Sequence, residues 1–202
     1  MGCLKNIISL IILILAIIGF YAVGGPDFVM NGINGIMNPS QQKTLEKAQK
    51  IADFDDISKA YKIKRVIDMF GIKAVFTEHE KTKQKIIIAD AENAINLTQE
   101  DVKSNKVEQK IQQALDKFSF MSVKVGKFEV IGKSNIQVLG RTVPYVKIKA
   151  NLAGLPYKNA EGILGVISQK DGSSRIFASF NEVGKFNFKV AETFFKELKP
   201  NL

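Results

Sequence analysis

The feature that most constrains this chain is an apolar stretch near its start, from Ile7 to Val23. Its 17 residues contain no charged side chain. A helix rises about 1.5 Å per residue, so a helix from Ile7 to Gly25 would span roughly 28 Å, close to the roughly 30 Å hydrocarbon core of a bilayer. The sequence therefore predicts a membrane anchor over residues 1–25. The residues predicted to lie in the bilayer or at its surface include Ile7, Leu10, Leu13, Ile17, Phe20 and Tyr21.

The flanking charges predict on which side of the membrane each part of the chain lies. Lys5 precedes the apolar stretch, whereas the first basic residue after it is Lys43. The positive-inside rule then places the amino terminus in the cytoplasm and the rest of a single-pass protein outside the inner or plasma membrane. The alternative is a signal peptide cleaved near Gly24, which would leave a secreted protein. The length of the apolar stretch and Pro26 just after it favour the uncleaved anchor.

The cysteine content limits the chemistry of the exported part. Cys3 is the one cysteine, and it precedes the apolar stretch, so it is not the lipid-attachment residue of a cleaved lipoprotein. The exported part therefore has no disulfide, no thiolate metal site and no cysteine nucleophile.

The net charge of +9 raises the question of a nucleic-acid partner. Of the 29 basic residues, three are arginines: Arg65, Arg141 and Arg175. Arginine is the residue best suited to bidentate phosphate contacts, so its scarcity argues against nucleic-acid binding. A lysine-rich surface instead suits a position near anionic lipid headgroups.

The rest of the chain divides into a predicted linker at residues 26–40, rich in Gly, Asn and Pro, and one domain at residues 41–202. Ser40 is a suitable cap for a first helix. One face of that helix would carry Leu45, Ala48, Ile51 and Ala52. A second helix is predicted from Ile57 to Phe70, ending at Gly71, because its apolar residues recur every three or four positions.

The pattern then changes to alternation, which predicts strands. Residues 72–77 and 86–89 form a predicted hairpin, with a polar tip at 78–85. An irregular polar stretch follows, and then a helix predicted from Val107 to Phe118, with Asn105 as part of a capping box.

Residues 120–180 carry mainly strand signals. Turns are predicted at 132–135, at Gly140 and at Asp171-Gly172. Residues 154–162 are a predicted loop. The strand before that loop is expected to alternate, with Val146, Ile148, Ala150 and Leu152 inward and Tyr145, Lys147, Lys149 and Asn151 outward.

A last helix is predicted from Phe188 to Leu198, stopped by Pro200. Its predicted buried residues are Ala191, Phe194, Phe195 and Leu198. Short turns between strands and clustered helices indicate an α+β domain, in which an antiparallel sheet is packed by helices. This order of elements is loosely similar to that of domains of the Mog1/PsbP kind, although no sequence motif carries the likeness.

No group of residues forms a convincing catalytic or metal-binding motif. His79 lies between Glu78 and Glu80, but strand alternation points the histidine away from both carboxylates, so an exposed turn is expected. Asp53 and its neighbours Asp55 and Asp56 lack the glycine and the distal glutamate of a calcium loop. They are expected to be an acidic cluster at the start of the second helix.

Two further patterns have plain structural explanations. The segment Gly162-Ile163-Leu164-Gly165 lacks the setting of a phosphate loop and is expected to allow close strand contacts or a bulge. The carboxylate pairs Asp90/Glu92 and Glu100/Asp101 are expected to be ionised in a polar loop. We therefore predict no catalytic residue, no cofactor and no metal, and expect that the chain is not an enzyme.

The sequence predicts a protein that acts by binding. Its first expected function is an accessory or assembly component of an envelope protein complex, with Tyr145, Lys147 and Lys149 as an exposed contact surface. The alternative is a carrier or sensor of a small apolar ligand or lipid at the membrane surface, with a pocket beside the aromatic helix at 186–198. A flat apolar patch over a sealed core would favour the first function, and a lined cavity of roughly 300 Å³ or more would favour the second.

Overall fold

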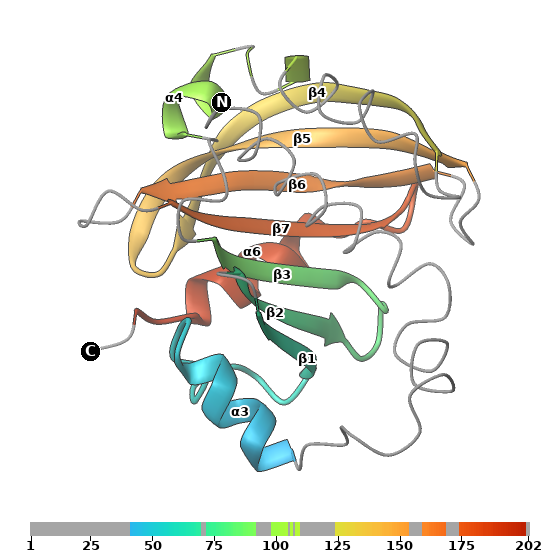
Figure 1. Cartoon of the computed structure of the whole chain (residues 1–202). Helices are drawn as coiled ribbons and strands as arrows, with labels where there is room; N and C mark the ends of the chain where they lie inside the picture. The colour runs from blue at the N-terminus through green and yellow to red at the C-terminus, as the bar shows by residue number, and fades with distance from the viewer. Residues whose placement is uncertain are drawn as a thin grey trace.

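The computed structural model describes residues 41–69, 72–91, 98–104, 106, 108–109, 124–153, 159–168 and 174–200. Its main element is a seven-stranded antiparallel sheet with the strand order β1-β2-β3-β7-β6-β5-β4 (Figure 1). The strands are β1 (Tyr61–Met69), β2 (Ile72–His79), β3 (Lys85–Ala91), β4 (Lys124–Val138), β5 (Arg141–Ala153), β6 (Asn159–Ser168) and β7 (Ser174–Glu182). The helices are α3 (Gln41–Gln49), α4 (Gln99–Lys103) and α6 (Phe188–Glu197). The predicted α+β class is confirmed over these residues.

Several predictions lie outside the described residues. These are the anchor, the linker, most of the helix at 107–118 and the turn at Asp171-Gly172. Within the described part of the chain, no helix combines the length and the apolar composition needed to cross a membrane.

One face of the sheet packs against α3 and α6. Along each strand alternate side chains point to this face, among them Ile88, Ile163 and Phe177, and all three are fully buried. The predictions for both helices are confirmed, because their expected apolar faces complete this core. The buried helical and adjoining residues are Ala48, Ile51, Ala52, Ala191, Phe194, Phe195 and Leu198.

The opposite face of the sheet is also buried. Phe76, Ile87, Leu164 and Val166 are at most 3% exposed, and Val102 of α4, which contacts β5 and β6, is equally covered. A strand buried on both faces is apolar at successive positions rather than at alternate ones. This explains the unbroken apolar run at residues 86–89 in β3.

The second predicted helix is wrong, because residues 61–69 form strand β1. Tyr61 and Ile63 face the core two positions apart, but a register shift between Ile63 and Arg65 moves the next core residue to Val66. The bulge therefore produces a spacing of three that imitates a helical repeat.

The predicted turn at residues 132–135 is also wrong. Strand β4 runs through it with a register shift between Val130 and Gly132. The break at Gly140 is confirmed, since Leu139 and Gly140 have positive φ angles of 51° and 70° between β4 and β5. Residue Gly162 lies inside β6 and not in the predicted loop, since the strand begins at Asn159.

The expected close contacts at the β6 glycines are confirmed. A Cβ atom on Gly162 would lie 2.2 Å from the Ser179 carbonyl oxygen, and one on Gly165 would lie 2.2 Å from Cζ of Phe177. These positions have room only for hydrogen, which is why both are glycine.

A buried glutamine fixes the beginning of α6 to the sheet. The Nε2 atom of Gln84 donates to the Ser179 hydroxyl at 2.9 Å and to the Asn187 carbonyl at 3.0 Å, while its Oε1 accepts from the Asn187 N–H at 2.8 Å. Asn187 is the N-cap of α6, and its side chain accepts from the Lys189 N–H. The position of α6 is therefore set by specific polar contacts as well as by packing.

Candidate functional site

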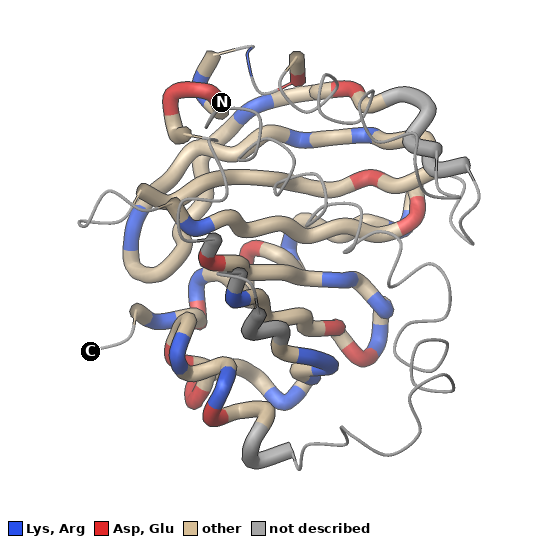
Figure 2. The backbone as a smooth tube through the Cα atoms, viewed as in Figure 1, with Lys and Arg blue, Asp and Glu red and all other residues tan. Residues whose placement is uncertain are grey.

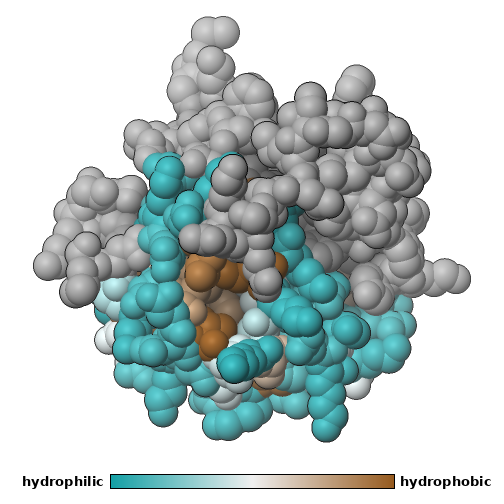
Figure 3. Space-filling view, turned by 90° about the horizontal axis from the view of Figure 1, so that it is seen from below, coloured by the Kyte–Doolittle hydropathy of each residue, from teal (hydrophilic) through white to brown (hydrophobic). Residues whose placement is uncertain are grey.

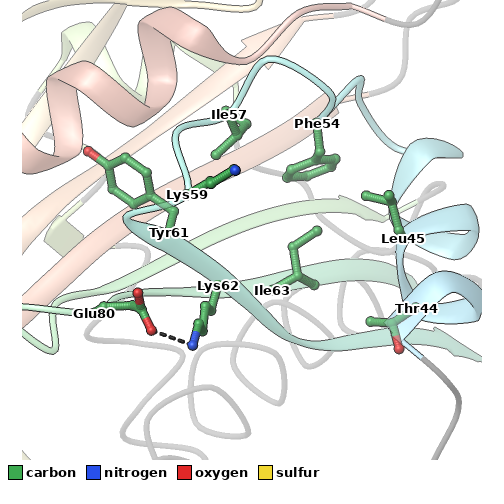
Figure 4. Close-up of a pocket in the computed structure, with 9 residues that line it drawn as sticks. All are labelled: Thr44, Leu45, Phe54, Ile57, Lys59, Tyr61, Lys62, Ile63 and Glu80. Carbon is green, nitrogen blue, oxygen red and sulfur yellow. Dashed lines mark ion pairs between the residues drawn. The ribbon is translucent and has the colours of Figure 1, made fainter.

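An open hollow of about 740 Å³ lies between α3 and β1, and we call it the α3–β1 groove (Figure 4). Its lining residues are Thr44, Leu45, Phe54, Ile57, Lys59, Tyr61, Lys62, Ile63 and Glu80. A view of the molecule from below, the side on which α3 and β1 lie, shows apolar atoms in a depression with hydrophilic atoms on both sides of it (Figure 3). Its size falls within the roughly 300–1,000 Å³ range of small-molecule sites.

The first wall of the groove is α3. Leu45 is half-buried and lies one turn before Ala48, which is completely buried in the core. Figure 4 shows Leu45 pointing from α3 toward Phe54 and Ile63. The same helical face that packs on the sheet thus continues into the groove.

The second wall is the connection from α3 to β1, which the carboxyl-terminal residues hold in place. Asp53 and Lys199 exchange backbone hydrogen bonds of 3.0 and 3.3 Å, and Lys199 also forms an ion pair with Asp56. The Glu197 carboxylate accepts from the Ser58 N–H at 3.0 Å. These contacts fix the loop that carries Phe54, Ile57 and Lys59.

The acidic cluster has a different role from the predicted one. Since β1 replaces the second helix, Asp53, Asp55 and Asp56 do not stand at the start of a helix. Asp55 accepts a hydrogen bond from Gln49 at 2.9 Å, while Asp53 and Asp56 hold Lys199. The cluster therefore joins the end of α3 to the end of the chain.

Tyr61 connects the groove to α6. Its hydroxyl donates to the Val190 carbonyl at 2.8 Å, and its ring centre lies 5.1 Å from that of Phe194. Burial, together with the nearby Glu197 carboxylate, raises the pKa of Tyr61 to about 12. The phenol is therefore neutral at physiological pH and acts as a hydrogen-bond donor inside the fold.

The rim of the groove carries the charged side chains. Lys62 and Glu80 form an ion pair, and the hydrogen bond from Lys62 holds the pKa of Glu80 below its ordinary value. Lys59 has no carboxylate partner among the described residues. The charges that line the groove therefore amount to one neutralised pair and one additional ammonium group.

His79 is at the end of β2, half-buried, and not in the exposed turn expected for it. Its Nδ1 accepts from the Thr82 N–H at 3.2 Å, and its ring centre lies 5.0 Å from that of Tyr61. Burial, with a smaller contribution from Lys81, lowers the pKa of His79 below its ordinary value. Among the residues with described positions, no three His, Asp or Glu side chains come together as a metal site.

Two of the three residues of the predicted contact surface are exposed, as expected for them, and the third is buried. Lys147 and Lys149 are exposed on β5, but Tyr145 is 3% exposed and stacks on Phe188 at a ring distance of 5.6 Å. Alternation along β5 is confirmed for these residues, since Tyr145, Lys147 and Lys149 lie on one face of the strand. Helix α6 covers that face at Tyr145 and leaves the two lysines exposed. A shallow pocket of about 250 Å³ lies beside Lys149, lined by Glu129, Lys149, Ala150, Asn151, Asn159 and Val183.

The ligand pocket expected beside the aromatic helix is not formed by the helix itself. Phe194 and Phe195 are fully buried, and Phe188 covers Tyr145. The groove lies instead between α3 and β1. Two of its lining residues, Tyr61 and Ile63, belong to the segment that the sequence pattern predicts to be a helix. Recognising the bulge in β1 would have revealed that these two apolar residues share the face of an edge strand.

The carboxylate pairs are also placed differently from the prediction. Asp90 lies in β3 and pairs with Arg175 of β7 at 2.8 Å. Asp101 is 6% exposed and completes a capping box with Thr98 at the start of α4. Both carboxylates therefore have structural partners within the fold.

Solved structures that are similar to this chain include one from a cyanobacterium. No protein-family model matches the chain, and no curated protein matches it. The solution structure of cyanobacterial PsbP (CyanoP) from Synechocystis sp. PCC 6803 matches with a TM-score of 0.42 and 12% sequence identity, over 74% of this chain and 89% of that one. A similarity of this size does not support an assignment of family or function.

Proposed function

We propose that this chain is a noncatalytic binding module, anchored by residues 7–23 with its domain outside the membrane, that takes up a small apolar ligand in the α3–β1 groove. The groove is the observation that carries the proposal. At about 740 Å³ it exceeds the size that would favour a ligand over a flat partner surface, and apolar side chains form its floor. Its walls are fixed by contacts from α6 and the carboxyl-terminal residues.

The charges around the groove support binding rather than catalysis. The described ionisable groups in the lining are Lys59, Tyr61, Lys62 and Glu80. Tyr61 is a neutral donor to a backbone carbonyl, and Lys62 and Glu80 neutralise each other. General acid-base catalysis works best with a group whose pKa lies near the working pH, but the pKa of Tyr61 is raised to about 12 and that of Glu80 is held below its ordinary value.

A membrane anchor would make this groove useful for ligands that partition into lipid. A tether confines the domain to the surface where such molecules are concentrated, which raises their effective concentration. Lysines and arginines are distributed over most of the described elements (Figure 2), an arrangement compatible with anionic headgroups close by.

The proposal is tested by photolabelling of the full-length protein in nanodiscs of uncharged phosphatidylcholine. The probe is dodecanol with a diazirine in its chain, and labelled peptides are identified by mass spectrometry. We expect labels on the peptides that carry Leu45, Phe54 and Ile57. Leu45→Glu and Ile57→Glu, which place a charge in the floor from two different elements, should each reduce labelling by about tenfold, since a charge buried without a partner costs well over 1 kcal/mol.

Val183→Glu is the matched control, because Val183 is an apolar residue that is 41% exposed outside the groove. This variant should be labelled as wild type, and circular dichroism should confirm the fold of all three variants. Unlabelled groove peptides in the wild type, or equal labelling in correctly folded Leu45→Glu and Ile57→Glu variants, would refute the proposal.

A second candidate function is that of an accessory component of an envelope complex. The observation that favours it is the exposed Lys147 and Lys149 beside the shallow pocket that contains Val183. The labelling experiment separates the two functions, because an accessory subunit without a ligand would give no labelled peptide from the groove.

A further inference from the structure

The geometry points to a single-chain amphiphile with a carboxylate head, a free fatty acid, as the ligand of the α3–β1 groove. This inference rests on the proposed function and adds the chemical class of the ligand. It is carried by the combination of an apolar floor and one ammonium group without a carboxylate partner at the rim.

The floor suits an acyl chain better than a polar molecule. Leu45, Phe54, Ile57 and Ile63 provide only carbon atoms, and the hydroxyl of Tyr61 is engaged with the Val190 carbonyl. A polar ligand placed over these residues would lose its hydrogen bonds to water without replacement. An alkyl chain has none to lose, and its burial is favourable in proportion to the apolar area removed from water.

The rim suits one negative charge. Lys62 is already paired with Glu80, so it is less available to the head of a ligand. Lys59 lines the same hollow and is exposed, with no acidic partner among the described residues. Its long side chain allows the ammonium group to meet an anionic head at the surface while its methylene groups lie along the apolar floor.

A peptide strand is a poorer fit to this site, although β1 is an edge of the sheet. Lys62 and Lys64 are exposed on β1, and a bulge interrupts its register beyond Ile63. Charged residues and bulges on an edge strand both oppose the addition of another strand. The favourable surface at this edge is the apolar hollow and not the backbone.

The proposed anchor brings the groove within reach of a membrane source. The 15 residues 26–40 separate the anchor from Gln41, the first residue of α3. A fully extended chain of that length spans at most about 50 Å. The first wall of the groove therefore begins within that distance of the bilayer, from which a free fatty acid could enter.

The test compares two photolabels that differ only at the head, diazirine-bearing dodecanoate and dodecanol, on the full-length protein in phosphatidylcholine nanodiscs. We expect the carboxylate to label the groove more strongly than the alcohol. Lys59→Glu should reduce labelling by dodecanoate about threefold to fivefold, in the upper part of the range for an exposed ion pair because the charge is reversed, and leave labelling by dodecanol unchanged. Lys147→Glu, the same change at an exposed lysine on β5, should affect neither probe.

The possible results separate this inference from the proposed function. Labelling by dodecanol with no preference for dodecanoate, or with no effect of Lys59→Glu, would overturn the inference and leave the apolar groove standing. Absence of labelling by both probes would overturn both. Loss of dodecanoate labelling when phosphatidylglycerol is added to the nanodisc would also overturn the inference, because a two-chain bilayer lipid would then be the preferred occupant.

Discussion

Glu78 is the acidic member of an ion pair buried at the ends of β2 and β3. It pairs with Lys85, and both residues are less than a tenth exposed. Lys64 and Lys83 lie 3.5 and 3.8 Å from the same carboxylate. Burial alone would raise the pKa of Glu78, but the hydrogen bond and charge of Lys85, with Lys64, hold it below its ordinary value of 4.5.

Removing this carboxylate should destabilise the protein strongly. Glu78→Gln removes the carboxylate that neutralises the buried Lys85 ammonium, so we expect the free energy of unfolding to fall by about 3 kcal/mol in urea titrations at neutral pH. Glu80→Gln is the control, because its ion pair with Lys62 is exposed and its loss should lower the free energy of unfolding far less than Glu78→Gln does. Equal losses in the two variants would contradict this account.

The same pair predicts how stability depends on pH. Because folding lowers the pKa of Glu78, its contribution is present above pH 4.5 and is lost as the pH falls through the lowered value of the folded state. The difference in unfolding free energy between wild type and Glu78→Gln should therefore shrink toward acidic pH. If the difference in unfolding free energy between the two proteins stayed constant down to strongly acidic pH, the Glu78 carboxylate would not be its source.

Among the elements, β6 depends most visibly on small residues. A Cβ atom on Gly165 would lie 2.2 Å from Phe177, which is fully buried, and 2.8 Å from the Pro144 carbonyl oxygen. Gly165→Ala should lower the unfolding free energy by about 3 kcal/mol, seen as a lower Tm, because overpacking displaces side chains and backbone. Gly132→Ala is the matched control, since its nearest neighbour would be the flexible Lys147 side chain at 3.6 Å. A loss no larger than that of the control would contradict the prediction.

Elements with an unbroken local pattern were predictable from the sequence. The apolar residues of α6 repeat at helical spacing up to Leu198, β2 begins with a polar-apolar alternation, and β3 carries an unbroken apolar run at residues 86–89. Strand β1 was not predictable in this way, because its bulge replaces a spacing of two by one of three between Ile63 and Val66. The prediction that Tyr145 is exposed was wrong for another reason. Alternation predicts on which face of β5 the side chain lies, but it does not predict that Phe188 of α6 covers that face.

At the scale of the whole molecule, the groove could not be predicted because distant segments build it. Tyr61 hydrogen-bonds to Val190, 129 residues later, and Ser58 to Glu197, 139 residues later. A local pattern predicts which residues of a segment are apolar, but not which segment covers them. The groove is therefore a property of the tertiary structure.

The membrane anchor is the prediction that belongs to the whole chain. We expect full-length protein to remain in the membrane fraction after alkaline extraction, with its carboxyl-terminal half open to protease added from outside the cytoplasmic membrane. Leu13→Lys combined with Ile17→Lys should release it, because a lysine at the centre of a spanning helix costs roughly 3 kcal/mol. Ser134→Lys combined with Asn135→Lys, two exposed positions of β4, adds the same charge and should leave the protein in the membrane.

The backbone pairing of Asp53 with Lys199 has a practical consequence for how the protein is handled. We expect a purification tag or fluorescent reporter joined close behind Pro200 to disturb the backbone pairing of Asp53 with Lys199, which positions Phe54 and Ile57. Such a fusion would report a weakened site even when every groove residue is intact. Reporters intended for affinity measurements should therefore be separated from Lys199 by a long flexible spacer.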